Sequence, residues 1–311
     1  MVMEPDTSVT LAGITLKNPV MSASGTFGYG QEYVDFVPPE VLGAVVTKGI
    51  SLKPRKGNPP PRIVETPAGM LNAIGLENVG LESFVRDKLP WLKDRGAVVV
   101  ANIYGETVDE YARVAEGLGR ADGVALLELN VSCPNVAAGG MAFGSDPEAV
   151  FRAVKAVVQA SGLPVMVKLT PMVTDIVAIA RAAVEAGGSA LSLINTIPGM
   201  AVDLDTRRPK LANVIGGLSG PAIKPVALRL CWQVVQNVDI PVVGVGGIAT
   251  GRDALEFILV GATAVQVGTA GFINPFAAVQ IIDEIRDYMR IKQMRDLEQI
   301  RGQFNKGFDR S

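Results

Sequence analysis

Short apolar runs alternate with longer amphipathic stretches along almost the whole chain. Each run has five to eight residues and is rich in Val, Ile, Leu and Ala. Strands of a parallel sheet are covered on both faces, so they are apolar almost throughout rather than at alternate positions. The pattern predicts eight buried strands, at Pro19–Ser24, Ala44–Lys48, Ala97–Ile103, Val124–Val131, Pro164–Leu169, Ala190–Asn195, Pro241–Val245 and Ala264–Gly268.

The stretches between the runs have the period of amphipathic helices. The clearest follows Asp146, a favourable N-cap, and Pro147, a residue type favoured at the first helical position. Its apolar residues then recur with i, i+3, i+4 spacing from Ala149 to Val158. Further helices are predicted at Leu81–Lys93, Val108–Leu118, Ile176–Ala186, Ala222–Val235, Arg252–Val260 and Phe276–Met289.

Eight strands that alternate with helices predict an α/β fold, a closed (β/α)8 TIM barrel. An open doubly wound sheet is the alternative. Two connections are unusually long, Gly49–Gly80 after the second strand and Thr196–Gly220 after the sixth. Both follow the carboxyl ends of strands, where barrel enzymes build their active sites, so we expect inserted loops with a binding or lid function. No linker or repeat interrupts the pattern, which predicts a single domain over residues 1–311.

Polar residues break the apolar character of two central strands. In the fourth strand, alternation puts Glu128, Asn130 and Ser132 on one face, and in the fifth Lys168 lies between apolar neighbours. An unpaired buried charge is costly, so we expect Glu128 to pair with Lys168 across the two strands. Such a pair could merely cap the barrel interior. Lys168 lies near the carboxyl end of its strand, which favours a functional role, whereas the deeper Glu128 is interpreted as structural.

The composition excludes several kinds of catalytic site. The 311 residues contain no His and two Cys, which rules out Ser-His-Asp and Cys-His nucleophile systems and His-ligated metal or haem sites. Two thiols also exclude a four-cysteine zinc site, a disulfide framework and an iron–sulfur cluster held by this chain alone. Any general base must therefore be a group other than imidazole.

Charge and hydropathy give no indication of nucleic acid or membrane as a partner. Lys and Arg total 29 against 31 Asp and Glu, and no apolar run reaches the length of a membrane span. A local basic cluster in the first long connection is interpreted as a loop feature, and it comprises Lys53, Arg55, Lys56 and Arg62. The residues Met1–Ser8 lack the features of a signal peptide, so we expect a cytoplasmic protein with free thiols.

The two cysteines invite different interpretations. A lone cysteine is more often a small buried apolar side chain than a catalyst, and this suits Cys231 on its apolar helix. Cys133 instead follows the fourth strand directly, within a segment rich in amide and hydroxyl groups, Asn130–Asn135. Its thiol could act as a base if the local field lowers its pKa.

Two glycine clusters close the last two strands, at Gly244–Gly247 and Gly268–Gly271. Backbone amides exposed by glycine beside a helix N-terminus form the phosphate site common in such barrels. Tight strand-to-helix turns need glycine in any case, which is the structural alternative. A phosphate site alone does not distinguish a flavin enzyme from a phosphosugar isomerase.

The order and spacing of these motifs resemble the class 1 dihydroorotate dehydrogenase family, flavin enzymes of pyrimidine synthesis, from about Val9 to Ile285. The matching segments are Asn18-Pro19 leading to Ala23-Ser24-Gly25-Thr26-Phe27-Gly28, then Thr47-Lys48-Gly49 and Asn72-Ala73-Ile74-Gly75-Leu76-Glu77-Asn78, with the Asn130–Asn135 segment, the strand ending near Lys168 and the glycine pairs. The resemblance implies oxidation of (S)-dihydroorotate to orotate in the de novo synthesis of UMP, with FMN as the cofactor.

The resemblance also implies a role for each matching residue. Cys133 would remove the C5 proton while a hydride leaves C6 for FMN, and Lys168 would offset negative charge on the reduced ring. The segment Gly49–Gly80 would supply much of the substrate site, and the loop with Cys133 would form a lid. FMN would contact Ser24, Lys48, Gly49, Asn102, Asn130, Lys168, Ile194, Gly220, Gly246, Gly247, Gly268 and Thr269. The substrate would contact Lys48, Asn72, Ala73, Ile74, Gly75, Leu76, Asn130, Asn195 and Thr196.

Two motifs, Asn72–Leu76 and Asn195–Met200, are similar to class 1B, the NAD-linked kind. Class 1B implies a catalytic FMN subunit with FAD and a [2Fe–2S] cluster on a separate partner subunit, in a heterotetramer of two catalytic and two electron-transfer chains. The fumarate-dependent class 1A is the alternative, and a flavin reductase of dihydropyrimidine bases is a further one. Two departures from the family pattern are Glu77, where Gln or Pro is common, and the basic tail Arg286–Arg310.

The glycine clusters are also compatible with a function of a different kind. The chain could be a flavin-free phosphate-binding barrel, either a lyase or isomerase or a simple binding protein. That hypothesis leaves Cys133, Lys168 and the asparagine clusters without an explanation.

Overall fold

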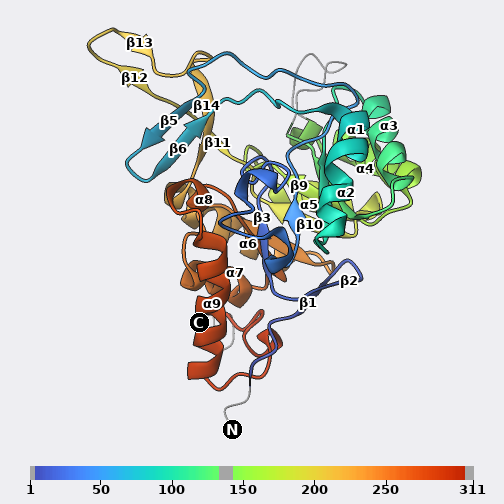
Figure 1. The fold of residues 1–311 in the computed structure, drawn as a ribbon, viewed down its shortest axis with the longest axis vertical. Coiled ribbons are helices and arrows are strands. Elements are labelled where there is room, and N and C mark those ends of the chain that lie inside the picture. The colour runs from blue at the N-terminus through green and yellow to red at the C-terminus, as the bar shows by residue number, and fades with distance from the viewer. Residues whose placement is uncertain (1–3, 133–142, 305–311) are drawn as a thin grey trace.

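The computed structural model describes residues 4–132 and 143–304, and its centre is an eight-stranded parallel sheet (Figure 1). The strand order is β3-β16-β15-β10-β9-β8-β7-β4. The two ends of this order meet, because Met21 pairs in parallel with Ala44 and the Ser22 amide donates to the Ala44 carbonyl at 3.2 Å. The strands are β3 (Val20–Ser22), β4 (Val45–Val46), β7 (Val99–Ile103), β8 (Val124–Asn130), β9 (Val165–Leu169), β10 (Ala190–Leu193), β15 (Val242–Val245) and β16 (Ala264–Val267).

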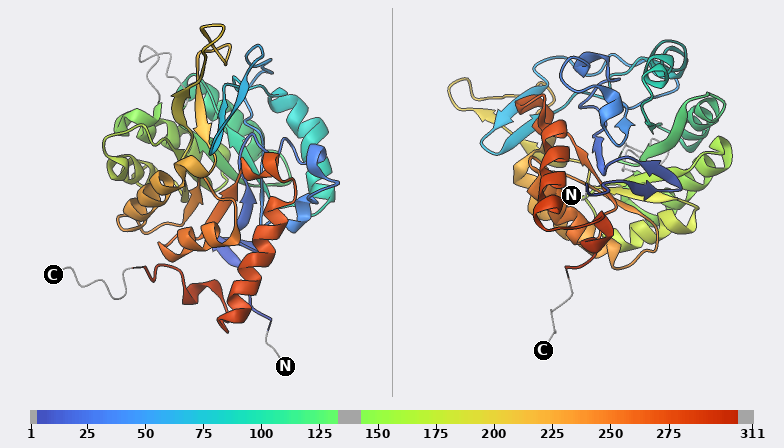
Figure 2. Two further views of the ribbon diagram at one scale, coloured as in Figure 1. Left: turned by 90° about the vertical axis from the view of Figure 1, so that its left-hand side faces the viewer. Right: turned by 60° about the horizontal axis from the view of Figure 1, so that its bottom comes forward.

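All eight predicted strands are confirmed, and the sheet is a barrel. The open doubly wound sheet was therefore the wrong alternative. Helices cover the outside of the barrel (Figure 2). They are α1 (Gly80–Ser83), α2 (Leu89–Asp94), α3 (Val108–Gly119), α4 (Pro147–Ser161), α5 (Ile176–Glu185), α6 (Lys224–Val235), α7 (Gly251–Leu259), α8 (Ala270–Ile273) and α9 (Ala277–Ile291).

The helix predicted over Leu81–Lys93 is divided by a π-helical turn, η3 (Phe84–Lys88), in which the Leu89 amide donates to the Phe84 carbonyl. Pro90 follows directly and has no amide proton for the carbonyl four residues earlier, which favours the wider turn at this point. The start of α4 agrees with its prediction, since the Asp146 carboxylate accepts a hydrogen bond from the Ala149 amide at 3.0 Å. Short 3-10 turns complete the helical set: η1 (Gln31–Tyr33), η2 (Pro39–Val41), η5 (Phe143–Ser145), η6 (Pro221–Ile223) and η7 (Leu297–Gln299).

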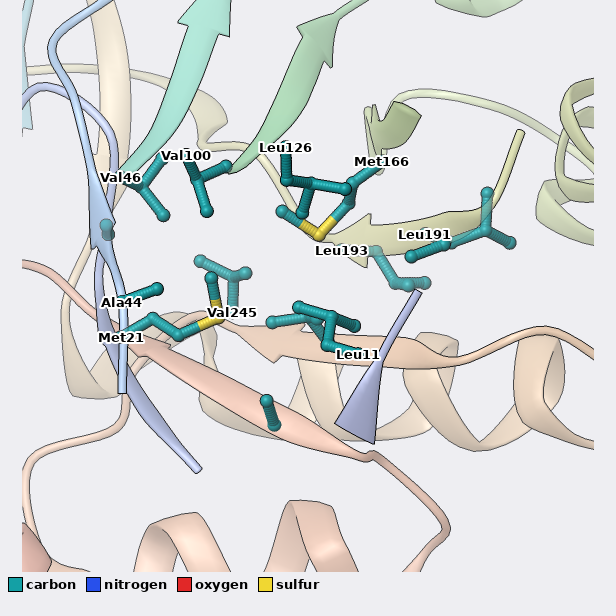
Figure 3. Close-up of a cluster of buried hydrophobic side chains, with 14 of the residues drawn as sticks. Leu11, Met21, Ala44, Val46, Val100, Leu126, Met166, Leu191, Leu193 and Val245 are labelled. Carbon is teal, nitrogen blue, oxygen red and sulfur yellow. The ribbon is translucent and has the colours of Figure 1, made fainter. Parts of the chain in front are cut away.

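Apolar side chains fill the lower part of the barrel. Figure 3 shows Met21, Val100, Leu126 and Met166 from four strands turned toward one another, with Leu11 among them. Leu11 is 1% exposed and belongs to a hairpin that the sequence pattern did not predict, β1 (Val9–Leu11) with β2 (Ile14–Leu16). The hairpin precedes β3, so it packs at the end where the barrel strands begin, and the opposite end is left for the site.

The sequence predicted two long inserted loops. The structure shows instead that the two connections fold together into a second sheet. Its four antiparallel strands have the order β11-β14-β6-β5, with β5 and β6 from the first connection and β11 and β14 from the second. This insertion sheet projects from one end of the barrel (Figure 1). Its strands are β5 (Ile63–Thr66), β6 (Gly69–Asn72), β11 (Ile197–Met200) and β14 (Ile215–Ser219), and the hairpin of β12 (Val202–Asp203) and β13 (Arg208–Pro209) lies beside them.

Within residues 4–132 and 143–304, no helix combines the length and the apolar composition needed to cross a bilayer.

Candidate active site

A cavity of about 840 Å³ lies between the carboxyl ends of the barrel strands and the insertion sheet. All of the predicted cofactor and substrate residues within the described chain line this cavity. Cys133, the predicted general base, lies outside the described residues. The predicted residues in the wall are Ser24, Lys48, Gly49, Asn72, Ala73, Ile74, Gly75, Leu76, Asn102, Asn130, Lys168, Ile194, Asn195, Thr196, Gly220, Gly246, Gly247, Gly268 and Thr269.

The expected pairing of Lys168 with Glu128 is confirmed at the floor of the cavity. Lys168 Nζ lies 3.5 Å from Glu128 Oε1, and the two side chains are 5% and 0% exposed. The register of the sheet sets Asn130 opposite Lys168, so Glu128 lies one side-chain level deeper on the same face. Lys168 also donates to Ser24 Oγ at 3.0 Å and to Gln266 Oε1 at 3.4 Å. The ammonium is therefore held at one point of the cavity wall by side chains of β8, β16 and the segment that follows β3.

Three neutral side chains satisfy the buried Glu128 carboxylate. Asn102 Nδ2 donates to Oε1 at 2.7 Å, Ser192 Oγ donates to Oε2 at 2.9 Å, and Gln266 Nε2 donates to Oε2 as well. Removing two charges from water is expensive, and a buried pair is tolerated when further hydrogen bonds saturate it. The barrel interior thus contains a fully partnered polar network beneath the cavity.

Two asparagines at the carboxyl ends of β8 and β10, the strands on either side of β9, fix each other. Asn195 Nδ2 donates to Asn130 Oδ1 at 3.3 Å, and the same oxygen accepts from the Ser132 amide at 3.1 Å. The Asn130 carbonyl accepts from the Tyr111 hydroxyl at 2.6 Å, and Asn195 Oδ1 accepts from the Thr196 amide at 2.8 Å. Both amide side chains are held in defined orientations along the cavity wall.

The wall formed by the first insertion is fixed by a second set of contacts. Asn58 binds two consecutive carbonyls of the Asn72–Leu76 segment, since its backbone amide donates to Ile74 and its Nδ2 donates to Ala73, each at 2.9 Å. Asn72 Nδ2 donates to the Gly217 carbonyl of β14 at 3.3 Å. The Asn72–Leu76 segment is therefore anchored to both insertions.

A charged cluster lies at the edge of this wall. Glu77 Oε2 is 2.7 Å from Arg62 Nη2 and 3.5 Å from Lys48 Nζ. Burial raises the pKa of Glu77, but the cations Lys48 and Arg62 outweigh it and hold this pKa below its usual value. Glu77 is thus an anion in the site at neutral pH, beside the predicted substrate residue Lys48.

The glycines that follow the last two barrel strands lie in the cavity wall, at the carboxyl ends of β15 and β16. Gly246, Gly247 and Gly268 line the cavity, and the short helix α8 begins directly after Thr269. Gly247 has φ +73°, and a Cβ there would lie 2.6 Å from Lys224 Cβ of α6. The turn itself needs this glycine, so its presence is explained without a ligand. The phosphate role stays a prediction that rests on position in the cavity wall.

Several polar groups of the site were not assigned from the sequence. Ser132 Oγ is buried, lines the cavity and has no hydrogen-bond partner within the described chain. Gln266 is the polar member of an otherwise apolar strand, and that interruption could have identified it. Since buried polar groups are normally paired, the free hydroxyl in a cavity rich in amides and glycine backbone fits a polar cofactor such as FMN.

Cys231 has the surroundings of a structural residue. It lies on α6 with no exposed surface, and burial raises the pKa of its thiol to about 12. A thiol that stays protonated is a poor nucleophile and a poor base. The interpretation of Cys231 as a small buried apolar side chain is confirmed.

Comparison with known proteins agrees with the resemblance over nearly the whole chain. A family model described as dihydroorotate dehydrogenase matches residues 7–289. A relative from Geobacter sulfurreducens, named dihydroorotate dehydrogenase B (NAD(+)), catalytic subunit, is 58% identical over 299 residues, which cover 96% of this chain and 98% of the relative. Relatives of the same name from Citrifermentans bemidjiense and Pelobacter propionicus are each 58% identical, covering 92% and 90% of this chain and 93% and 92% of their own lengths.

Proposed function

The chain belongs to the dihydroorotate dehydrogenase family, and on this basis we propose that it oxidises (S)-dihydroorotate to orotate in de novo pyrimidine (UMP) biosynthesis. It acts as the FMN-binding catalytic subunit of an NAD-linked, class 1B enzyme. The relatives reported above are all catalytic subunits of an NAD(+) enzyme by name, which supports this subclass over class 1A.

One observation carries the proposal. Residues from distant parts of the chain, matched to cofactor or substrate roles by short motifs alone, line one and the same cavity. A flavin-free phosphate-binding barrel would need only the glycine clusters of β15 and β16. It would have no use for the asparagines of β8 and β10 or for Lys168.

FMN would lie along the wall formed by Ser24, Lys48, Asn102, Asn130, Lys168 and the glycine clusters. When bound, it supplies the oxidant by accepting a hydride from C6 of the substrate. The chain's own contribution is to hold the Lys168 ammonium at the cavity floor, where Ser24, Gln266 and Glu128 fix it. Such a fixed charge needs no reorganisation when negative charge develops nearby.

The substrate is a small anionic ring with several amide groups. Asn72, Asn130 and Asn195 offer both donors and acceptors to such a ring, and Lys48 offers a positive charge. Cys133, which follows the end of β8 at a distance of three residues from Asn130, would remove the proton from C5. Asn130 and Ser132 hold that strand end in place through the hydrogen bond between them.

The electrons would then leave for NAD+ through FAD and a [2Fe–2S] cluster on a partner subunit, in a heterotetramer with two copies of each chain. The two thiols of this chain cannot ligate such a cluster. A cytoplasmic location is part of the proposal, since a reducing compartment keeps Cys133 in its thiol form.

The first test is the colour and the reduction of the purified protein. We expect a yellow preparation that releases FMN on denaturation and is bleached by dihydroorotate without oxygen. A colourless protein that cannot be reconstituted with FMN would overturn the proposal. Rapid turnover with fumarate by the isolated chain would overturn the NAD-linked part alone.

A further inference from the structure

The charged cluster of Lys48, Glu77 and Arg62 has no role in the proposed chemistry beyond that of Lys48. We propose that Arg62 and Glu77 form a neutral pair that leaves Lys48 as the one net positive charge for the substrate. Arg62 is then a specificity-determining residue for a singly charged anion. The inference rests on the proposed function, because dihydroorotate and orotate each carry one carboxylate.

The distances divide the cluster into a tight pair and a loose contact. Glu77 Oε2 lies 2.7 Å from Arg62 Nη2 in a direct hydrogen bond, whereas Lys48 Nζ lies 3.5 Å away. Lys48 keeps 25% of its side chain exposed and lines the cavity. Its ammonium can therefore bind a second anion without breaking the contact between Glu77 and Arg62.

The charged side chains of the described cavity wall and their ion-pair partners add up to a single positive charge before any cofactor is counted. The charged side chains among the described wall residues are Lys48, Lys168 and Glu77. Lys168 is balanced by Glu128 and Glu77 by Arg62, so Lys48 remains. Without Arg62 the sum would be zero, and a carboxylate placed at Lys48 would also face the uncompensated charge of Glu77.

Arg62 does not line the cavity but is hydrogen-bonded to the backbone of two segments that do. Its carbonyl accepts from the Ala73 amide at 2.8 Å, and its Nη1 donates to the Asn58 carbonyl at 3.3 Å. Gly57 leaves room for the guanidinium, because a Cβ there would lie 3.0 Å from Arg62 Nη1 and 2.5 Å from the Ile74 oxygen. Arg62, directly before β5, thus contacts Ala73 within the substrate segment and Glu77 directly after it.

The test measures the dissociation constant of orotate with the FMN-loaded protein, by the change in flavin absorbance on titration. Arg62→Gln should raise this constant about tenfold, since it leaves an unpaired carboxylate beside the ligand. Glu77→Gln should lower it about threefold, because one positive charge is added. The double variant should return to within about threefold of the wild type, an effect that damage to the wall would not produce.

Two controls separate charge from structure. Arg62→Lys keeps the charge but not the planar fork, and should stay within about threefold of the wild type. Glu116→Gln removes the same charge from the last turn of α3, where Glu116 pairs with Arg120, and should leave the constant unchanged. Should Arg62→Gln fail to fold, Glu77→Gln and the double variant carry the test.

The outcomes distinguish the two proposals. If the wild type binds FMN but not orotate, the proposed function fails and this inference fails with it. If the wild type binds orotate and the double variant is as weak as Arg62→Gln alone, Arg62 is a structural residue and only the present inference fails. Unchanged or weaker binding by Glu77→Gln would overturn it as well.

Discussion

The two cysteines differ in the segments of the chain to which they belong. Burial keeps the Cys231 thiol protonated on α6, with a pKa raised to about 12. Cys133 follows a strand end whose neighbours Asn130 and Ser132 both face the cavity. In the sequence, Cys133 is thus three residues from Asn130 of the cavity wall, whereas Cys231 is not among the described residues that line that cavity.

Replacing Cys133 by Ala should leave FMN bound and slow flavin reduction by dihydroorotate about 10²–10⁴-fold, as expected on loss of a general base. Anaerobic stopped-flow absorbance measures the rate. Cys231→Ala is the matched control and should reduce flavin at the wild-type rate. Unchanged kinetics in the Cys133 variant would remove this residue from the role.

Glu128 offers a prediction about stability. Glu128→Ala would leave the Lys168 ammonium and three hydrogen-bonding side chains without their partner, and should lower the free energy of unfolding by about 3–5 kcal/mol. Glu128→Gln keeps the shape and part of the hydrogen bonding, so it should lose less. Urea unfolding followed by circular dichroism at a fixed FMN concentration measures both. A loss below about 1 kcal/mol in the Ala variant would contradict the structural role of this carboxylate.

Residue by residue, the sequence predicted the side chains that line the cavity better than the residues that hold them in place. Lys168 and Glu128 were visible because a charge inside an apolar strand is costly. Ser132 and Arg62 were not assigned. The first was expected on the polar face of its strand but without a partner or role to distinguish it, and the second lay in a basic cluster that gave no sign of facing Glu77.

Among the secondary-structure elements, the barrel strands and their helices were predictable because local periodicity reports them directly. The β1–β2 hairpin was not, since its strands have three residues each and its turn, Ala12–Gly13, has little turn signal. The insertion sheet was missed for another reason. Asn72 and Gly217, which pair across it, are 145 residues apart, and no local pattern reports such a pairing.

The start of α7 predicts a dependence of stability on pH. Thr250 and Asp253 form a capping box, and Lys224 of α6 donates to Asp253 Oδ1 at 2.6 Å. Burial raises the pKa of Asp253, but the hydrogen bonds from Lys224, Ala249 and Thr250 outweigh it and lower this pKa below 3.8. A lowered folded-state pKa contributes stability that is present above the unfolded value and is lost as the pH falls through the folded value.

Asp253→Asn should therefore reduce the free energy of unfolding at pH 6, and its difference from the wild type should shrink as the pH falls below about 4. Denaturant unfolding at several pH values measures the difference. Asp239→Asn, at an exposed position, should run parallel to the wild type. A pH-independent difference for Asp253→Asn would show that its charge is not the stabilising feature.

The junction of the two insertions can be tested at Gly69. A Cβ on this residue would lie 1.9 Å from the Ser219 carbonyl oxygen of β14. Gly69→Ala should therefore push β6 away from β14, weaken dihydroorotate binding and lower the free energy of unfolding by about 1–3 kcal/mol. Steady-state KM and thermal unfolding measure the two effects. Gly96 has open space around it and a φ of +70°, so Gly96→Ala should cost about 1 kcal/mol of backbone strain and leave KM unchanged.

For the whole molecule, the cysteine count makes a prediction about assembly. The isolated chain should carry flavin without stoichiometric iron, and dihydroorotate should reduce that flavin without any reduction of NAD+. Addition of the iron–sulfur partner should restore NAD+ reduction. Metal analysis and NADH absorbance before and after mixing provide the measurement. NAD+ reduction by the iron-free chain alone would contradict the prediction that the partner subunit is needed for this step.

The pairing of the two insertions also limits how such an enzyme can change. A segment transplanted from a relative into Gly49–Gly80 would bring β5 and β6 but leave the old β11 and β14 to pair with them. The insertion sheet is therefore encoded by two separate stretches of the gene. Substitutions in β5 and β6 should be selected together with substitutions in β11 and β14. Chimeras that exchange both halves should fold more often than those that exchange one.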